Sequence, residues 1–240
     1  MASINIENLY VSGIDNLARS ETLKEFVIKG LTRKNKKQVK IPILKDVSLK
    51  ADEGDVLGVV GKNGSGKSSL LKVIAGIYSE EKGIVVTEGT ITPVIEMGLG
   101  FNPEMSGYDN IKLGFVYSGR IDKHNDEIVQ RIIDFSELEE KIDIPLKYYS
   151  SGMVARLAFA VSCMQDSDIL LLDEVFATGD EHFRTKSYNF MKKKILNTAI
   201  TILVNHNRNE ILNICNRCIM MEDGKIVMDG TPAEVFNCYN

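Results

Sequence analysis

The chain alternates between short apolar runs and longer stretches in which apolar residues recur every three or four positions. The run Ile-Leu-Leu-Leu at residues 169–172 is continuous, as is typical of strands buried on both faces, and residues 56–60 form another such run. The predicted strands are residues 4–10, 56–60, 91–95, 169–172 and 199–204. A hairpin is predicted over residues 218–227, with its turn at Asp223-Gly224.

Between these strands the apolar spacing changes to that of helices. Residues 98–165 are mostly helical by their pattern, and within them Ile128, Val129, Ile132 and Ile133 share one helical face. Further helices are predicted from Lys67 onward and over residues 181–196, 208–215 and 232–239. Strands that alternate with helices indicate an α/β fold with a largely parallel sheet. The long helical segment is interpreted as a subdomain inserted into that fold.

One stretch near the N-terminus stands outside this alternation. Residues 21–31 predict an amphipathic helix with Ser20 in the N-cap position, and a basic run follows it. The apolar residues of that helix are Leu23, Phe26, Val27 and Leu31, and the basic residues are Arg33, Lys34, Lys36, Lys37 and Lys40. Such a pair can lie on a membrane surface. It can also be a solvated insertion that packs its apolar stripe on the core, which the residues alone favour.

Composition narrows the class of protein. Apolar residues make up 44% of the 240 positions and charged residues 26%, which is ordinary for a globular domain and excludes collagen-like, disulfide-rich and disordered chains. The 29 Lys and Arg against 33 Asp and Glu give a net charge of −4, which argues against nucleic acid as a partner. No apolar run approaches the roughly 20 residues that span a bilayer, and the N-terminus lacks the pattern of a signal peptide.

The four cysteines do not indicate a metal or redox centre. Cys215 and Cys218 form a C-x-x-C pair, but a zinc site needs two further ligands at suitable spacing, and none stand nearby. The pair also lies between a predicted helix and a predicted strand, whereas a redox pair opens a helix. We expect these two, together with Cys163 and Cys238, to be reduced and mostly structural thiols.

Residues 61–68, Gly-Lys-Asn-Gly-Ser-Gly-Lys-Ser, match the phosphate-binding pattern G-x-x-x-x-G-K-[ST] between a predicted strand and a predicted helix. The glycines let backbone N–H groups face the phosphates, and the helix points its positive end at the same anions. In this pattern Lys67 reaches the β- and γ-phosphates, and the Ser68 hydroxyl ligates Mg²⁺. The predicted nucleotide-binding residues here are Gly61, Lys62, Asn63, Gly64, Ser65, Gly66, Lys67, Ser68 and Ser69.

Two carboxylates and a histidine follow buried strands. Asp173 and Glu174 come directly after residues 169–172, and His206 ends the segment Ile202–His206, at the carboxyl end of the strand over residues 199–204. Ligands of open α/β sheets bind at the carboxyl ends of the strands, so all three are expected beside the phosphate loop. Asp173 would hold Mg²⁺, Glu174 would act as general base toward a water molecule, and His206 would hydrogen-bond the γ-phosphate. Glu174, His206 and Lys67 are the predicted catalytic residues.

In their order along the chain these motifs resemble those of ABC ATPases. Residues 149–153, Tyr-Ser-Ser-Gly-Met, resemble the family signature L-S-G-G-Q and open an alanine-rich helix before Asp173-Glu174. The resemblance covers residues 5–239. It implies a P-loop NTPase with a RecA-like, mostly parallel sheet, an inserted helical subdomain and an antiparallel β edge. One domain over residues 1–240 is expected, with its core at about 1–96 and 166–240, the helical subdomain at about 97–165 and an insertion at 20–40.

Two departures from the family pattern point to a subfamily. The signature is altered, and the Gln expected after the strand at residues 91–95 is absent, which leaves Glu96 or Met97 in its place. These features resemble the ATPases that export polysaccharide, O-antigen or teichoic acid chains from bacteria. We favour Glu96 as the Mg²⁺ contact. Some such exporters carry a C-terminal glycan-reading domain, which we do not expect here because the chain stops at Asn240.

The resemblance also implies a mechanism. Two copies form a head-to-tail homodimer that sandwiches two ATP molecules with Mg²⁺, which is held by Ser68, Asp173 and Glu96. The signature residues Ser150, Ser151, Gly152 and Met153 face the ATP of the opposite copy, and Asp180 belongs to the adjoining loop. Tyr10 is the candidate to stack on the adenine, with a buried strand tyrosine as the equally weighted alternative.

Partners follow from the same resemblance. They are two copies of a polytopic membrane permease and, through it, a lipid-linked polysaccharide, with the ATPase peripheral at the cytoplasmic face of the inner membrane. By the resemblance, the insertion would lie close to where the lipid-linked chain enters. The alternative is a soluble ABC-type ATPase of DNA repair or translation, which usually has two ATPase halves or a long coiled coil. A P-loop kinase is disfavoured by the signature and by His206.

Overall fold

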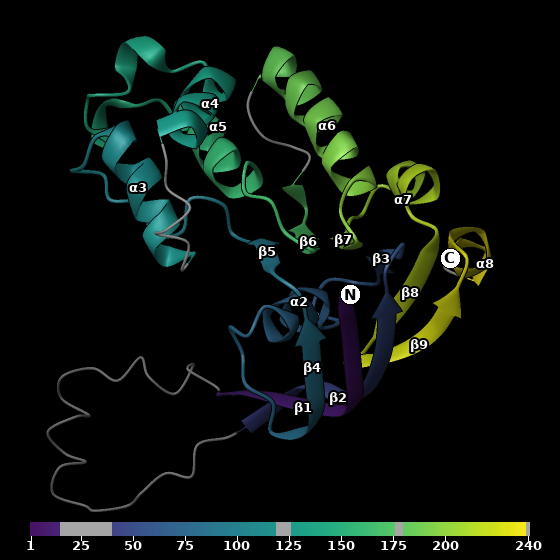
Figure 1. Ribbon diagram of the computed structural model, residues 1–240. Helices are drawn as coiled ribbons and strands as arrows, with labels where there is room; N and C mark the ends of the chain where they lie inside the picture. The colour runs from purple at the N-terminus through teal and green to yellow at the C-terminus, as the bar shows by residue number, and fades with distance from the viewer. Residues whose placement is uncertain (15–39, 119–125, 176–179, 239–240) are drawn as a thin grey trace, which may run out of the picture.

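The computed structural model describes residues 1–14, 40–118, 126–175 and 180–238, and Figure 1 shows their arrangement. These residues form a six-stranded sheet in the order β5-β6-β7-β3-β8-β9 and a three-stranded antiparallel sheet in the order β2-β1-β4. A group of helices stands above the larger sheet in this view, and the smaller sheet lies below it. The predicted α/β fold with an antiparallel edge is confirmed.

Five strands of the larger sheet run parallel, and only the last pair, β8 and β9, is antiparallel. In chain order the strands are β3 (Val56–Val60), β5 (Ile91–Val94), β6 (Ile169–Asp173), β7 (Ile200–Val204), β8 (Arg217–Glu222) and β9 (Lys225–Gly230). The four strands predicted for this sheet are confirmed to within one residue at their ends, and the predicted hairpin is confirmed with a second strand that continues three residues further. Because β3 lies between β7 and β8, the phosphate loop leaves the middle of the sheet.

The smaller sheet was predicted only in part. Its strands are β1 (Ser3–Ile14), β2 (Lys40–Asp52) and β4 (Lys82–Glu88), whereas the sequence predicts one shorter strand over residues 4–10. Ser3 pairs with Asp52 on one side and with Glu88 on the other, so the sheet depends on contacts between distant parts of the chain. Strand β4 also leaves Ile84 and Val86 exposed, which removes the clean alternation that marks a strand.

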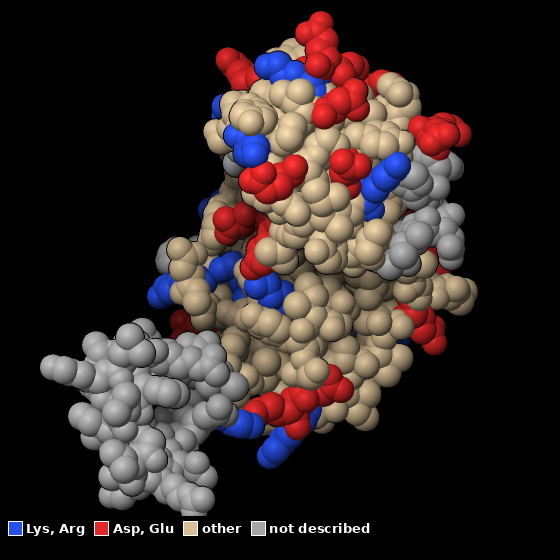
Figure 2. All heavy atoms as spheres, turned by 90° about the vertical axis from the view of Figure 1, so that its left-hand side faces the viewer, with Lys and Arg blue, Asp and Glu red and all other residues tan. Residues whose placement is uncertain are grey.

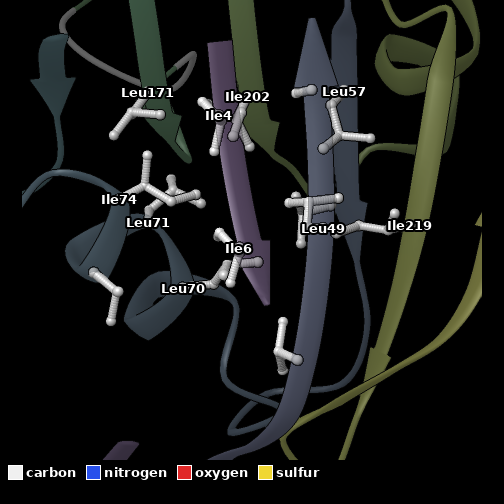
Figure 3. Close-up of a cluster of buried hydrophobic side chains, with 14 of the residues drawn as sticks. Ile4, Ile6, Leu49, Leu57, Leu70, Leu71, Ile74, Leu171, Ile202 and Ile219 are labelled. Atoms are coloured by element: carbon white, nitrogen blue, oxygen red, sulfur yellow. The ribbon is translucent and has the colours of Figure 1, made fainter. Parts of the chain in front are cut away.

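Helix α2 fills the space between the two sheets. It spans Lys67–Ile74 and buries Leu70, Leu71 and Ile74 against both sheets. Figure 3 shows these side chains meeting Ile4 and Ile6 of β1, Leu49 of β2 and Leu57, Leu171, Ile202 and Ile219 of the larger sheet. The helix that carries the phosphate loop therefore rests on a close-packed apolar layer on both sides.

The opposite face of the larger sheet is covered by helices. They are α5 (Ser151–Cys163), α6 (Glu181–Leu196), α7 (Arg208–Ile214) and α8 (Pro232–Cys238), and all four contribute to one apolar cluster, together with Cys163, Cys215 and Cys218. These three cysteines are buried and Cys238 is exposed, and all four are free thiols, as predicted. Burial raises the pKa of Cys215 and of Cys218 to about 12 and raises that of Cys163 further.

The predicted helical subdomain joins α3 (Gly107–Tyr117), α4 (Asp126–Ser136) and α5 around a third apolar cluster. Val129, Ile132 and Ile133 of α4 are buried there, and Ile128 is half-buried against it. Two short 3-10 turns, Glu139–Lys141 and Leu146–Tyr148, lead into α5. The predicted helix at residues 21–31 and most of the basic run after it lie outside the described residues. None of the helices in the described ranges is long and apolar enough to cross a membrane.

Candidate functional site

The phosphate loop connects β3 to α2, and its glycines are required by the fold. Gly61, Gly64 and Gly66 have φ values of 146°, 80° and 104°, in the region that favours glycine. A Cβ atom on Gly61 would lie only 2.2 Å from the backbone oxygen of Met221. The loop therefore lies directly against the backbone of β8.

Lys67 is held inside this loop. Its Nζ donates hydrogen bonds to the backbone oxygens of Gly61, at 2.9 Å, and of Lys62, at 3.0 Å, and the residue is 6% exposed. Burial lowers the pKa of this ammonium group, and the negative charges of Glu174 and Asp173 act in the opposite direction. The lysine is thus positioned as a fixed positive charge at the centre of the loop.

The N-terminus of α2 is open toward the same point. Gly66 is its N-cap, and in this helix, all of which the structure describes, no side chain caps the N-terminus and no acidic residue lies in the first turn. The first N–H groups of a helix have no partner within the helix, so they are available to an anion. A cavity of about 320 Å³ lies there, lined by Ile43, Asn63, Gly64, Gly66, Lys67, Ser68, Ser69 and Glu174.

Ile43 of β2 was missed by the sequence analysis. It lines this cavity, and its backbone oxygen lies close to where a Cβ on Gly66 would be. One aliphatic residue among several, in the run Ile41-Pro42-Ile43-Leu44, gives no sequence signal for such a position. Among the described residues that line the cavity Tyr10 does not appear, since its ring instead lies 6.0 Å from Nζ of Lys82, on the smaller sheet.

Glu174 and His206 meet at the carboxyl ends of neighbouring strands. Strands β6 and β7 pair in parallel, with Asp173 opposite Val204. The His206 Nε2 atom lies 2.6 Å from Oε1 of Glu174, and both side chains are about half exposed, at 49% and 54%. The backbone N–H of Glu174 donates to the oxygen of Val204 at 3.1 Å, and its φ of 52° turns the residue out of the strand. The structure therefore brings together the two groups that were predicted to act at the γ-phosphate.

Asp173 occupies the last position of β6 and is half-buried. Its negative charge partly opposes the lowering of the Lys67 pKa by burial, and it adds a small part to the raised pKa of Lys72, which is due first to the hydrogen bond with Glu96, so the carboxylate lies near α2. A carboxylate here and the Ser68 hydroxyl at the start of α2 are hard oxygen donors, the kind that Mg²⁺ prefers. The donor set therefore fits a magnesium ion held beside the phosphate loop.

Glu96 and Met97 have different surroundings. The Glu96 carboxylate accepts a hydrogen bond from Nζ of Lys72 at 2.7 Å and is half exposed, whereas Met97 packs on the apolar cluster under α5 and α6. Glu96 also lines a groove of about 400 Å³ between the core and the helical subdomain, together with Ile77, Leu99, Phe101 and Tyr117. Figure 2 shows the surface hollowed between the upper, helical part and the lower part of the molecule. The groove lined by Glu96, Ile77, Leu99, Phe101 and Tyr117 is called the subdomain groove below.

The signature residues begin α5 at the surface. The Ser150 hydroxyl caps the helix by accepting the N–H of Met153 at 3.2 Å. Ser151 is exposed and Gly152 half-buried, and a Cβ on Gly152 would find only Oγ of Ser150, 3.9 Å away. Ser150, Gly152 and Met153 line a cavity of about 350 Å³ that also reaches Asp180. Tyr149 lies beneath, with its hydroxyl donating to the oxygen of Lys141 at 2.7 Å.

Asp180 is joined to the signature helix by Arg156, a residue that the sequence analysis did not single out. Asp180 caps α6 by accepting the N–H of Phe183 at 2.9 Å and forms an ion pair with Arg156. Arg156 also pairs with Glu137, at 2.9 Å, and its guanidinium lies 5.3 Å from the Phe183 ring centre. The arginine therefore ties α4, α5 and α6 together directly behind the signature.

Comparison with known proteins shows which family the chain is similar to. Residues 44–177 match the family described as ABC transporter. The chain is 37% identical over 196 residues to the O-antigen export system ATP-binding protein RfbB of Klebsiella pneumoniae, covering 82% of this chain and 80% of RfbB. It is 34% identical over 231 residues to the corresponding RfbE protein of Yersinia enterocolitica, covering 94% and 97%.

Other relatives are longer. The chain is 35% identical over 197 residues to the ABC transporter protein AbcA of Aeromonas salmonicida, but this covers only 64% of that protein. Among solved structures, the fold is similar to the dimeric structure of an ATP-binding cassette in a post-hydrolysis state bound to ADP and Pi. That similarity has a TM-score of 0.71 at 19% identity and covers 95% of this chain and 98% of the other.

Proposed function

The chain belongs to the ABC transporter family, and from this membership we propose that it is the ATP-hydrolysing subunit of an exporter of a lipid-linked polysaccharide. One observation carries the proposal most directly. Lys67, the open N-terminus of α2 and Glu174 line a single cavity, and Nε2 of His206 lies 2.6 Å from Oε1 of that carboxylate. Relatives that are ATP-binding proteins of O-antigen export systems indicate the polysaccharide as cargo.

The phosphate loop is the proposed ATP site. The N–H groups of the loop and of the first turn of α2 bind the phosphate oxygens, and Lys67 supplies a positive charge toward the β- and γ-phosphates. Ser68 and Asp173 would hold Mg²⁺, which neutralises charge on the β- and γ-phosphates when bound. Ile43 is the residue of the smaller sheet that lines the cavity at the loop, and Tyr10 stays the proposed adenine contact.

Glu174 and His206 are the proposed hydrolytic pair. Glu174 accepts a proton from the water molecule that attacks the γ-phosphorus, ADP departs, and inorganic phosphate forms. His206 holds the Glu174 carboxylate in place through the contact at 2.6 Å and donates to the γ-phosphate when it is present. General-base assistance of this kind contributes about 10²–10⁴-fold to a rate.

The active assembly is proposed to be a head-to-tail homodimer. The signature residues lie at the surface of this single chain, beside a cavity that no other described element of the chain fills. In the dimer the Ser150 hydroxyl and the N-terminus of α5 would face the γ-phosphate bound by the other copy. Closure of the dimer would then depend on the γ-phosphate, and hydrolysis of ATP would allow the two copies to separate again.

Glu174→Gln tests the mechanism. This variant should bind ATP, form a stable dimer with ATP and Mg²⁺, and hydrolyse ATP about 10²–10⁴-fold more slowly than the unmodified chain. Light scattering after size exclusion reports the dimer, and phosphate release reports turnover. Glu127→Gln, an exposed carboxylate of α4, is the matched control and should behave as the unmodified chain. A Glu174→Gln chain that stays monomeric and hydrolyses normally would contradict the proposal.

A membrane permease is the proposed partner, at the cytoplasmic face of the inner membrane. The subdomain groove supports a permease as partner, because its lining is partly apolar. It lies between the core and the helical subdomain, the two parts of the chain that would move relative to each other when the dimer closes. Tagged Glu174→Gln protein, isolated from native membranes in mild detergent with ATP and Mg²⁺, should bring down an equal amount of a polytopic protein and a lipid-linked glycan. A dimer without a membrane partner would favour the soluble ABC-type ATPase instead.

A further inference from the structure

One ion pair connects the phosphate-loop helix to the root of the helical subdomain. The Lys72 Nζ atom donates to Oε1 of Glu96 at 2.7 Å. Lys72 lies in the last turn of α2, four residues after Ser68, and residues at this spacing share one face of a helix. A carboxylate that reaches Lys72 is therefore one helical turn from the hydroxyl proposed to hold Mg²⁺.

Glu96 is positioned to transmit what happens at that helix. It follows β5 almost directly, and its φ of 54° starts a turn in which the N–H of Leu99 donates to the oxygen of Glu96 at 3.1 Å. This turn forms one side of the subdomain groove, with Tyr117 of α3 across it. A change of partner at the Glu96 carboxylate would thus shift the turn at which the core joins the helical subdomain.

We propose that Lys72 is a positioning residue that holds the Glu96 carboxylate away from the metal site, and that a divalent cation at Ser68 and Asp173 competes with Lys72 for Glu96. The inference rests on the proposed function, because it presumes that Mg²⁺ accompanies ATP at the phosphate loop. It adds to that function a specific residue, Lys72, that competes with the metal ion for the Glu96 carboxylate.

The contacts make such an exchange feasible. Lys72 has other favourable neighbours when Glu96 leaves, since its Nζ lies 5.5 Å from the Tyr78 ring centre and senses the negative charge of Asp173. The Glu96 carboxylate is 53% exposed, and ion pairs with such exposure contribute only about 0–1 kcal/mol. A doubly charged cation that prefers oxygen ligands can overcome an interaction of that strength.

The experiment measures the Mg²⁺ concentration at half-maximal ATP-driven dimerisation, in the Glu174→Gln background, so that turnover plays no part. Lys72→Met frees the carboxylate and should lower this concentration about two- to fivefold, the range that the strength of an exposed ion pair allows. Lys72→Arg retains the pair and should stay close to the parent. Glu96→Met removes the oxygen ligand and should raise the concentration, because a thioether is a poor ligand for Mg²⁺.

The double variant Lys72→Met/Glu96→Met decides between competition and a general charge effect. If Lys72 acts through Glu96, the double variant matches Glu96→Met alone. If Lys72→Met shifts the Mg²⁺ requirement equally in both backgrounds, or in neither, the proposal is overturned. Lys72→Gln takes the place of Lys72→Met if the latter does not fold.

Lys147→Met is the matched control, because Lys147 and Glu104 form an ion pair of the same 2.7 Å length in the helical subdomain. It should not change the Mg²⁺ requirement. The proposed function fails in a different way, when the Glu174→Gln parent forms no dimer at any Mg²⁺ concentration. In that case a double-mutant cycle on thermal unfolding without nucleotide still reports whether Lys72 and Glu96 are coupled, and zero coupling overturns the positioning role.

Discussion

The phosphate loop and the signature segment are both built around glycines, but the chain needs these glycines for different reasons. Gly61 is pressed against the backbone of Met221, and its φ lies in the region reserved for glycine. Gly152 has ordinary helical surroundings and open space where a Cβ would go. The fold of one copy accounts for Gly61 and leaves Gly152 unexplained, which is the pattern expected if the signature is shaped for something outside the chain.

The same contrast holds for the polar groups. Lys67 is buried and fixed by two backbone oxygens of its own loop, whereas Ser150 and Ser151 are exposed and only the Ser150 hydroxyl has a role, as a helix cap. One half of the proposed ATP site is thus complete in a single chain. The other half is a surface held in position from behind by Arg156 and its two carboxylate partners.

The largest effect should come from Gly61→Ala. The new Cβ would collide with the backbone of β8 and force a strained φ, which together destabilise the protein by about 2–5 kcal/mol. Gly64→Ala is the matched control, because its φ of 80° is also strained but no atom lies within 4 Å of its Cβ. Chemical denaturation should show a clearly smaller loss for Gly64→Ala. Equal losses would mean that the contact with Met221 is unimportant.

Lys67→Ala should come next, with turnover reduced about 10²–10³-fold, as for other residues that stabilise charge in the transition state. It should also weaken ATP binding, which nucleotide fluorescence can measure. Lys225→Ala, an exposed lysine of β9, serves as the control and should hydrolyse ATP normally. Full turnover by the Lys67→Ala protein would refute the assignment of the phosphate loop.

Gly152→Ala should reverse the behaviour of Gly61→Ala. Stability should stay the same or rise by up to about 1 kcal/mol, because alanine favours a helix and meets no clash. ATP-driven dimerisation should weaken about tenfold, since the methyl group would stand where the other copy's nucleotide approaches. If Gly152→Ala lost as much stability as Gly61→Ala, the claim that only Gly61 is required by the fold of a single copy would be wrong.

The smallest effect concerns the support behind the signature. A hydrogen bond from Lys186, together with the nearby charges of Lys186, Arg156 and His182, lowers the pKa of Glu137. A carboxyl with a depressed pKa stabilises the fold above its unfolded pKa, about 4.3, and this contribution is lost as the pH falls through the folded pKa. Glu137→Gln should therefore flatten the fall in the free energy of unfolding below about pH 4.3, by under about 1 kcal/mol because the Glu137 side chain is still 33% exposed, and melting curves recorded against pH would measure it. If the fall in stability at low pH were the same in Glu137→Gln and in the unmodified chain, the charges around Glu137 would make no contribution to stability.

The sequence was sufficient wherever the signal is local. Strands β3 and β6 and helices α2 and α6 follow from spacing within a few residues, and these predictions are confirmed, including the strand and the helix on either side of the phosphate loop. The contact between Glu174 and His206 needed the strand order, because only the pairing of β6 with β7 brings the two residues together. Strands β2 and β4 were missed for a related reason, since their partners lie far away in the chain.

Individual polar contacts between side chains could not be predicted from the sequence. Nothing in the spacing of Arg156 and Asp180, or of Lys72 and Glu96, indicates that they pair, since each pair joins two separate elements. The glutamate and methionine at residues 96 and 97 remained open alternatives until the structure showed Met97 in the apolar cluster. Whether Glu96 contacts Mg²⁺ stays a prediction.

The distribution of the thiols has a practical consequence. Cys163, Cys215 and Cys218 are buried with raised pKa values, so they react slowly with alkylating reagents near neutral pH, whereas Cys238 is exposed at the end of α8. A maleimide spin label or fluorophore would therefore attach selectively at Cys238 without removing any native cysteine. Two labelled copies would report the opening and closing of an ATP-driven dimer through a single interprobe distance.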